Sequence, residues 1–132
     1  MARRGDSFQK ANYVPRLGDV VHLDWSPAEG HEMIGPHYGL VLSADLYNHA
    51  TGLVVVVPIT SKGGKVSNFE LPVQAGRVNG VAVLSGLRSL DYQIRDIQYE
   101  DKANPEIVTE ANRRVCMIFC QRKVRMSPLS AK

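Results

Sequence analysis

The sequence predicts a small, mostly antiparallel β-sheet with one α-helix packed on it near the C-terminal end. Short apolar and β-branched runs recur between residues 20 and 97, separated by glycine- and proline-containing turns, which is typical of short strands. Residues 105–118, in contrast, space their apolar side chains as an amphipathic helix does. The chain has 132 residues, of which 44% are apolar and 22% charged, and this length indicates one domain.

The predicted strands follow one another along the chain, each bounded by turn residues. They cover residues 20–25, 39–42, 53–59, 69–73, 81–84 and 88–97. The run 53–59 is apolar and mostly β-branched, which indicates a central strand buried on both faces. Between the first two strands, Gly30, Gly35 and Pro36 favour a long loop over residues 28–36, and a short helical turn is expected at 44–48.

The last predicted element is a helix with clear start signals. Asn104 suits the N-cap, Pro105 the first helical position, and Glu106 the positive end of the helix dipole. The apolar face that should pack on the sheet consists of Ile107, Val108, Ala111, Val115 and Ile118. Cys116 and Cys120 lie four residues apart, which is not the CxxC spacing of redox or zinc motifs, so we expect buried thiols.

Charge is distributed unevenly along the chain. Residues 1–112 hold all 13 acidic residues and 10 basic ones, a net of −3, whereas residues 113–132 hold six basic residues and no acid. We therefore expect a flexible arm at 1–13, a folded domain at 14–120 and a basic tail at 121–132.

The longest apolar run, residues 53–57, is far below the ~20 residues of a membrane span, and the charged N-terminus resembles no signal peptide. We therefore expect a cytoplasmic protein. The basic tail suits a polyanionic partner, or equally a solvated end that keeps the protein soluble.

Two patterns that suggest a metal site fail on spacing. His31-Glu32 begins like the zinc-protease HExxH motif, but the next histidine is His37, six residues on, beyond the helix-breaking Gly35 and Pro36. The four histidines of the chain show no ligand spacing. The sequence therefore predicts no metal and no cofactor.

An ordered series of short motifs resembles the MazF/PemK family of toxins over roughly residues 14–120. The series runs VPRLGD, DWSP, GHE, LVLS, YN, TG, VPIT, GV, RSLD and the Pro-Glu start of the last helix. The resemblance implies an SH3-like barrel that forms a homodimer, cleaves single-stranded RNA and is restrained by a cognate antitoxin protein. It also implies cleavage without metal, in which the ribose 2′-OH attacks the adjacent phosphate to leave a 2′,3′-cyclic phosphate and a 5′-OH.

The resemblance assigns catalytic roles to three positions. Thr60 matches the family threonine after the proline of the central strand. His37 stands where the family carries a catalytic arginine, and Ser85-Gly86 replaces its Asp-Gln pair. A histidine, with an ordinary pKa near ~6.5, suits proton transfer at neutral pH. His37, Thr60 and Ser85 are therefore the predicted catalytic residues.

The same comparison predicts RNA-binding residues. Arg88 and Arg95 match basic family positions, and Tyr38 beside His37 could stack a base. Trp25 ends a strand and is expected in core or dimer packing rather than against a base. Two readings remain open. Either the site cleaves RNA, or the change from arginine to histidine has left a catalytically impaired module that binds antitoxin or nucleic acid. A gyrase poison is a more remote possibility, because CcdB-like toxins share the barrel.

Overall fold

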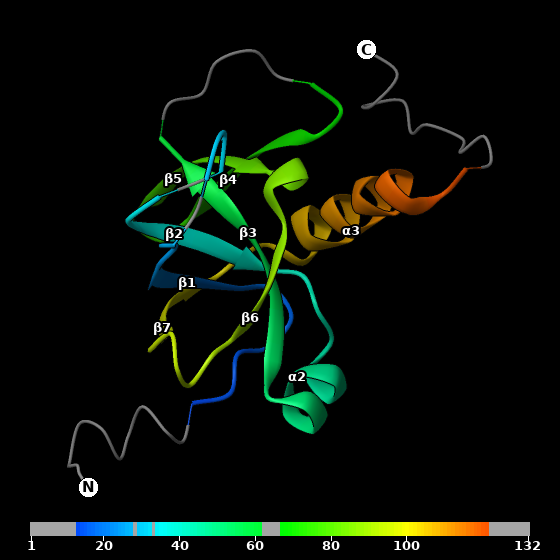
Figure 1. Ribbon diagram of the computed structural model, residues 1–132. Coiled ribbons are helices and arrows are strands. Elements are labelled where there is room, and N and C mark those ends of the chain that lie inside the picture. The colour runs from blue at the N-terminus through cyan, green and yellow to red at the C-terminus, as the bar shows by residue number, and fades with distance from the viewer. Residues whose placement is uncertain (1–12, 28, 33, 62–66, 122–132) are drawn as a thin grey trace, which may run out of the picture.

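The sheet of this protein curls into a half-barrel, and one long helix packs against it (Figure 1). The computed structural model describes residues 13–27, 29–32, 34–61 and 67–121. Its elements are β1 (Asp19–Asp24), β2 (Pro36–Val41), α2 (Asp45–Thr51), β3 (Leu53–Thr60), β4 (Glu70–Ala75), β5 (Val78–Val83), the 3-10 turn η1 (Leu84–Gly86), β6 (Arg88–Asp91), β7 (Gln98–Lys102) and α3 (Pro105–Phe119). The predicted arm and basic tail lie outside the described residues, apart from Tyr13 and Gln121.

β3 is the central strand, as its apolar run predicts. The sheet order is β4-β5-β3-β2-β1-β7, β6 pairs with β3 off this path, and every pairing is antiparallel. Alternate β3 residues face two different core clusters, with Val54 and Val56 in one and Val57 and Ile59 in the other. Trp25 is fully buried in the first of these clusters, so of the two expected places, core or dimer interface, it takes the core.

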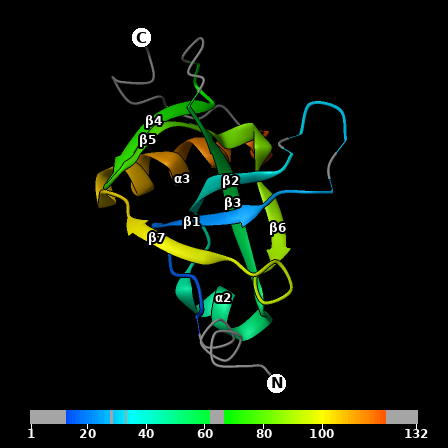
Figure 2. The same cartoon turned by 90° about the vertical axis from the view of Figure 1, so that its left-hand side faces the viewer.

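The two ends of the sheet meet where the β4–β5 turn reaches β7, as Figure 2 shows. Arg77 lies in this turn and pairs with Glu100 of β7, with Nε 2.7 Å from Oε2. Gly76 has a positive φ of 58°, and a Cβ atom there would lie 2.0 Å from Oδ2 of Asp101. Glycine therefore permits both the turn conformation and the close approach that curls the sheet.

The prediction of one strand over residues 88–97 is wrong, because the structure divides this segment. β6 ends at Asp91, whose Oδ1 accepts hydrogen bonds from the backbone N–H groups of Gln93 and Ile94. A side chain that accepts hydrogen bonds from the backbone donors two and three residues on favours a turn over an extended ladder. Asp96 then takes a positive φ of 56°, and β7 begins at Gln98 as a separate strand on β1.

α3 begins as its sequence predicts, but its cysteines are not buried. The Asn104 side chain accepts a hydrogen bond from the N–H of Glu106 at 2.8 Å, and Val108 and Ala111 are buried against the sheet. Cys116 and Cys120 are both exposed, so the expectation of buried thiols is wrong. Cys116 follows the half-buried Val115 by about 100° around the helix, which turns it away from the core, and Cys120 caps the helix end. No helix among the described residues is long and apolar enough to cross a membrane.

Tyr13 packs against the folded domain through a hydrogen bond to a buried carboxylate. Its hydroxyl donates to Oδ2 of the buried Asp19 at 2.7 Å, and Lys102 pairs with the same carboxylate. Burial, followed by the hydrogen bond to Asp19, raises the pKa of Tyr13 well above its ordinary value of 10.0.

We therefore expect Tyr13→Phe to lower the free energy of unfolding by about 1–2 kcal/mol at pH 7. Above pH ~10 the unfolded tyrosine loses its proton while the folded one keeps it, so the advantage of the wild type should shrink. Urea titrations of both proteins between pH 7 and pH 11 measure this difference. A difference that does not change with pH would show that Tyr13 ionises equally in both states.

Candidate active site

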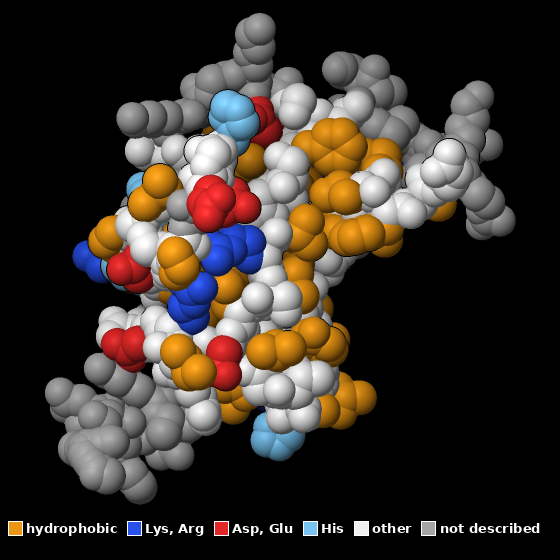
Figure 3. Space-filling view, viewed as in Figure 1, with side chains coloured by type: hydrophobic (Ala, Val, Ile, Leu, Met, Phe, Trp, Pro, Cys, Tyr) orange, Lys and Arg blue, Asp and Glu red, His pale blue; other side chains and the backbone are white. Residues whose placement is uncertain are grey.

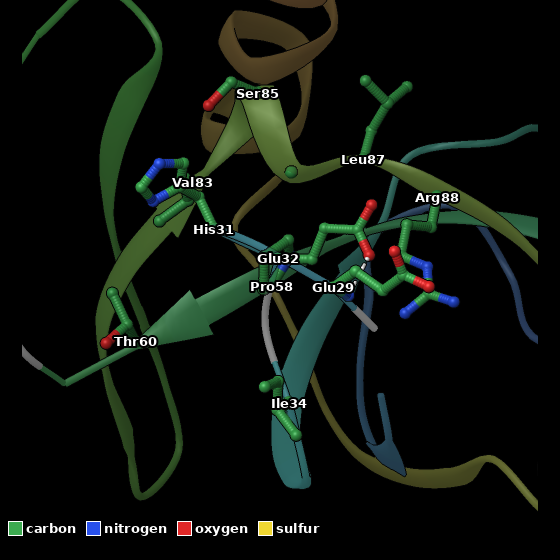
Figure 4. A pocket seen from close by; sticks show the side chains of 11 residues that line it. Glu29, His31, Glu32, Ile34, Pro58, Thr60, Val83, Ser85, Leu87 and Arg88 are labelled. Carbon is green, nitrogen blue, oxygen red and sulfur yellow. Dashed lines mark hydrogen bonds between the residues drawn. The ribbon is translucent and has the colours of Figure 1, made fainter. Parts of the chain in front are cut away.

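A cavity of about 810 Å³ opens where three parts of the half-barrel meet (Figure 4). The β1–β2 loop forms one wall, the end of β3 forms the floor, and the segment from β5 through η1 to β6 forms the other wall. The lining residues are Glu29, His31, Glu32, Ile34, Pro58, Thr60, Val83, Ser85, Gly86, Leu87 and Arg88. Three predicted site residues, Thr60, Ser85 and Arg88, are thus brought together from distant parts of the sequence.

Two glycines allow the close backbone packing that brings Thr60 and Ser85 to one cavity. Thr60 ends β3 and pairs with Val81 of β5. A Cβ atom at Gly80 would lie 2.6 Å from the carbonyl oxygen of Thr60, so only glycine allows this close strand contact. A Cβ atom at Gly86 would lie 2.9 Å from Cγ of Pro58, so η1 can sit directly on β3 and place Ser85 at the cavity wall.

Arg88 lines the cavity and also anchors its loop wall. Its guanidinium donates to the carbonyl oxygens of Trp25 at 2.5 Å and Pro27 at 3.2 Å, at the start of the β1–β2 loop. Arg95 donates to the carbonyl oxygens of Asp24 and Ser26 from the neighbouring turn, but it is not among the lining residues. The two arginines therefore hold the same stretch of backbone, and only Arg88 faces the cavity.

The loop wall is also braced by its own residues. The backbone N–H of Glu29 donates to Oε1 of Glu32 at 2.9 Å, and the N–H of Glu32 donates to the carbonyl of Glu29. At the far end, the N–H of Trp25 donates to the carbonyl of Gly35, which has a φ of 82°. The described part of the loop is thus braced at its base, between Trp25 and Gly35, and again within the loop, between Glu29 and Glu32.

His37 lies beside the cavity rather than in it. The β2–β3 ladder pairs Tyr38 with Ile59 and Gly39 with Pro58, so the next position along it places His37 opposite Thr60. Directly opposed residues of an antiparallel pair share one face of the sheet. His37 is half-buried and is not among the cavity-lining residues, and it pairs with Leu23 on its other side.

Tyr38 points to the opposite face of the sheet from His37, because side chains alternate along a strand. Its ring packs against the core cluster that contains Leu40 and meets the ring of His22 at 5.1 Å between centroids. The structure therefore separates Tyr38 and Arg95 from the cavity. His37 lies one position beyond the last β2–β3 pair, Tyr38 with Ile59, on the face of the sheet that carries Thr60.

Sequence reasoning missed three ionisable residues of the cavity, namely Glu29, His31 and Glu32. His31 and Glu32 were considered as zinc ligands and as part of the GHE family motif, but they were not assigned to the site. The described residues hold no cluster of three metal-binding side chains. Figure 3 shows acidic and basic side chains close together on this side of the molecule, whereas hydrophobic side chains gather toward α3. A cluster of three ionisable residues within four positions of a loop was the signal that could have found them.

Comparison with known proteins decides the family. A model of the "PemK-like, MazF-like toxin of type II toxin-antitoxin system" family matches residues 16–119. The chain belongs to this family. It is 31% identical over 96 residues to the endoribonuclease toxin MazF of Escherichia coli strain K12, covering 73% of this chain and 86% of that protein.

Solved structures of MazF share this fold. MazF from Deinococcus radiodurans (Form-I) superposes with a TM-score of 0.75 at 34% identity, covering 82% of this chain and 98% of that one. A MazE-MazF structure (Form-II) from the same organism gives a TM-score of 0.69 at 29% identity over 82% and 97% of the two chains. The predicted family and the predicted β-fold with a C-terminal helix are therefore confirmed.

Proposed function

We propose that this protein is a toxin that cleaves single-stranded RNA in the cavity between the β1–β2 loop and η1. The observation that carries the proposal is the convergence of Thr60, Ser85 and Arg88 on one cavity, in a member of the MazF-like family. The similar Escherichia coli protein is named an endoribonuclease toxin. The cavity has room for a nucleotide and offers hydroxyl groups and a guanidinium, which suit a phosphodiester.

The reaction needs no external nucleophile. The ribose 2′-oxygen forms a bond to the adjacent phosphorus and loses its proton to a base, while the bond from phosphorus to the 5′-oxygen breaks and that oxygen gains a proton from an acid. The products are a 2′,3′-cyclic phosphate and a 5′-OH, so neither water nor a redox partner is consumed. The protein must supply two proton transfers and stabilise the charge that develops on the phosphorane oxygens.

The described residues can be matched to these tasks. Arg88 supplies positive charge to the non-bridging oxygens, and the hydroxyls of Thr60 and Ser85 hydrogen-bond the same group. His37, next to Thr60 along the β2–β3 ladder, carries one proton transfer. Arg95 is a positioning residue, because it holds the backbone at the start of the loop wall without reaching the cavity.

We also propose that the protein acts in the cytoplasm as a homodimer and is inhibited there by a cognate antitoxin. One solved relative is described as a MazE-MazF structure, and the matched family is that of toxins from toxin–antitoxin systems. Because the partner of such a toxin must block its RNA cleavage, co-expression of the antitoxin should restore growth to cells that express this chain.

Cleavage of single-stranded RNA in the presence of EDTA tests the proposal. We expect products with 5′-OH ends and with 3′ ends that resist phosphatase until acid opens the cyclic phosphate. Thr60→Val, which keeps the β-branched shape but removes the hydroxyl, should lower kcat/KM at least about tenfold. Loss of cleavage in EDTA would contradict the metal-independent reaction. Binding of RNA without any cleavage by the wild type would favour the impaired binding module instead.

A further inference from the structure

The two cysteines of the chain lie on the outer face of α3, at its C-terminal end. Cys116 and Cys120 are both exposed, whereas Val108, Ala111 and Arg114 of the same helix are buried. In Figure 1 this end of α3 extends past the edge of the sheet. Neither thiol is among the residues that line the cavity, so the proposed RNA cleavage gives these two side chains no role.

The backbone of the last helical turn sets the distance between the two side chains. α3 runs to Phe119, and the N–H of Cys120 donates to the carbonyl oxygen of Cys116 at 3.0 Å, so the helical path persists up to Cys120. Residues four positions apart on a helix lie one above the other on one face, with Cβ atoms ~5–6 Å apart. The end of α3 therefore presents a pair of neighbouring thiols to solvent.

This spacing suits a bridging metal ion better than a disulfide. A disulfide needs Cβ atoms ~3.5–4.5 Å apart, so its formation between Cys116 and Cys120 would have to unwind the last helical turn. A metal–thiolate bond is ~2.3 Å long, and two such bonds in a line span ~4.6 Å, which matches the separation of side chains four positions apart. The helix as folded can therefore hold one ion between the two sulfur atoms.

The number of available ligands decides which ion fits. A structural zinc ion takes four ligands, and the described residues hold no group of three His, Cys, Asp or Glu side chains that could share a metal. The carboxylate of Glu110, earlier on α3, is already paired with Arg113 and Arg114. Cu(I) is a soft ion that prefers thiolate sulfur, and two ligands in a line complete its coordination.

We propose that Cys116 and Cys120 form a binding site for one Cu(I) ion on the outer face of α3. Each thiol loses its proton to solvent and forms one Cu–S bond, and the ion keeps its oxidation state. The bound ion closes the last turn of the helix alongside the hydrogen bond from Cys120 to Cys116. The inference does not depend on the proposed RNA cleavage, because neither cysteine belongs to the cavity.

Anaerobic titration of the reduced full chain with Cu(I), in competition with the chelator bicinchoninate, tests the inference. We expect one Cu(I) per chain and the ultraviolet charge-transfer absorption of Cu(I)–thiolate bonds. Cys116→Ser and Cys120→Ser should each weaken binding at least about 100-fold, because the second thiolate of the intact pair binds at a high effective concentration. The matched control Met117→Leu removes the neighbouring thioether sulfur and should keep the wild-type Kd.

Hydrogen exchange shows whether the ion spans the helical turn. The backbone amide of Cys120 should exchange more slowly with Cu(I) bound, because the ion holds together the two residues of its hydrogen bond, and Cys116→Ser should abolish this slowing. An unchanged exchange rate, a wild-type Kd in either serine variant, one Cu(I) shared by two chains, or Zn²⁺ bound as tightly as Cu(I) would overturn the inference. A wild type that binds Cu(I) as expected but cleaves no RNA would contradict the proposed function alone.

Discussion

Replacing Arg88 with glutamine is expected to lower kcat/KM for RNA cleavage by about 10²–10³, whereas Arg95→Gln should lower it less than about tenfold. Removal of one preorganised group that stabilises transition-state charge has effects of the larger size. Both arginines hold backbone carbonyls between Asp24 and Pro27, so both substitutions loosen the same part of the loop wall. Only Arg88 also faces the cavity, so only its loss removes positive charge from the proposed phosphate position.

The pair of variants therefore distinguishes two roles for Arg88. Initial rates with a single-stranded RNA oligonucleotide give kcat/KM, and thermal unfolding of both variants shows how much each arginine stabilises the fold. Equal losses of activity in Arg88→Gln and Arg95→Gln would mean that Arg88 acts only by anchoring the loop. Arg88→Lys separates charge from anchoring. Lysine keeps the positive charge, but it lacks the planar guanidinium that donates to two carbonyl oxygens at once.

Most of the fold follows from local sequence signals. The uninterrupted apolar run that includes Val54 and Val57 predicts a central strand, and β3 has that position because both of its faces meet a core cluster. The helix start at Asn104 is equally local, since the cap depends on residues two positions apart. The division of residues 88–97 was not predicted, because the alternation of apolar and polar residues looks the same whether or not Asp91 turns the chain.

The candidate site is less accessible to sequence reasoning, because its members come from three separated segments. Family positions indicated Thr60, Ser85 and Arg88, and the structure places all three on one cavity. The same positions could not show that Arg95 faces away, since the direction of a side chain depends on the turn that follows β6. His31 stands in the GHE motif of the family resemblance, but only the path of the β1–β2 loop shows that it reaches the cavity.

The docking of α3 depends on a buried charge, and its removal has the largest expected effect on stability. Arg114 is 4% exposed, and its Nε donates to Oε2 of Glu110 at 2.6 Å. Its Nη1 also reaches the carbonyl oxygens of Asn68 and Glu70 beside β4, at 3.5 and 3.3 Å. We expect Glu110→Gln to lower the free energy of unfolding by about 3 kcal/mol, because it leaves a buried guanidinium without its counter-charge.

Urea denaturation of three variants tests this expectation. Arg113→Ala removes the more exposed partner of the same glutamate and should cost under about 1 kcal/mol. The double variant Glu110→Gln/Arg114→Met removes the buried charge together with its partner, so it should recover most of the stability lost in Glu110→Gln alone. A Glu110→Gln protein as stable as Arg113→Ala would show that the backbone carbonyls suffice to hold Arg114.

The same variants connect helix packing to RNA cleavage. α3 packs against η1 as well as β4, and η1 carries Ser85 and Gly86 into the wall of the cavity. A loosened helix should therefore disturb the cavity wall before the whole domain unfolds, since elements that lose buried contacts open first. We expect Glu110→Gln to lose RNA cleavage at urea concentrations where β-sheet circular dichroism is still native. The double variant should lose both signals together, because its helix is docked without a buried charge.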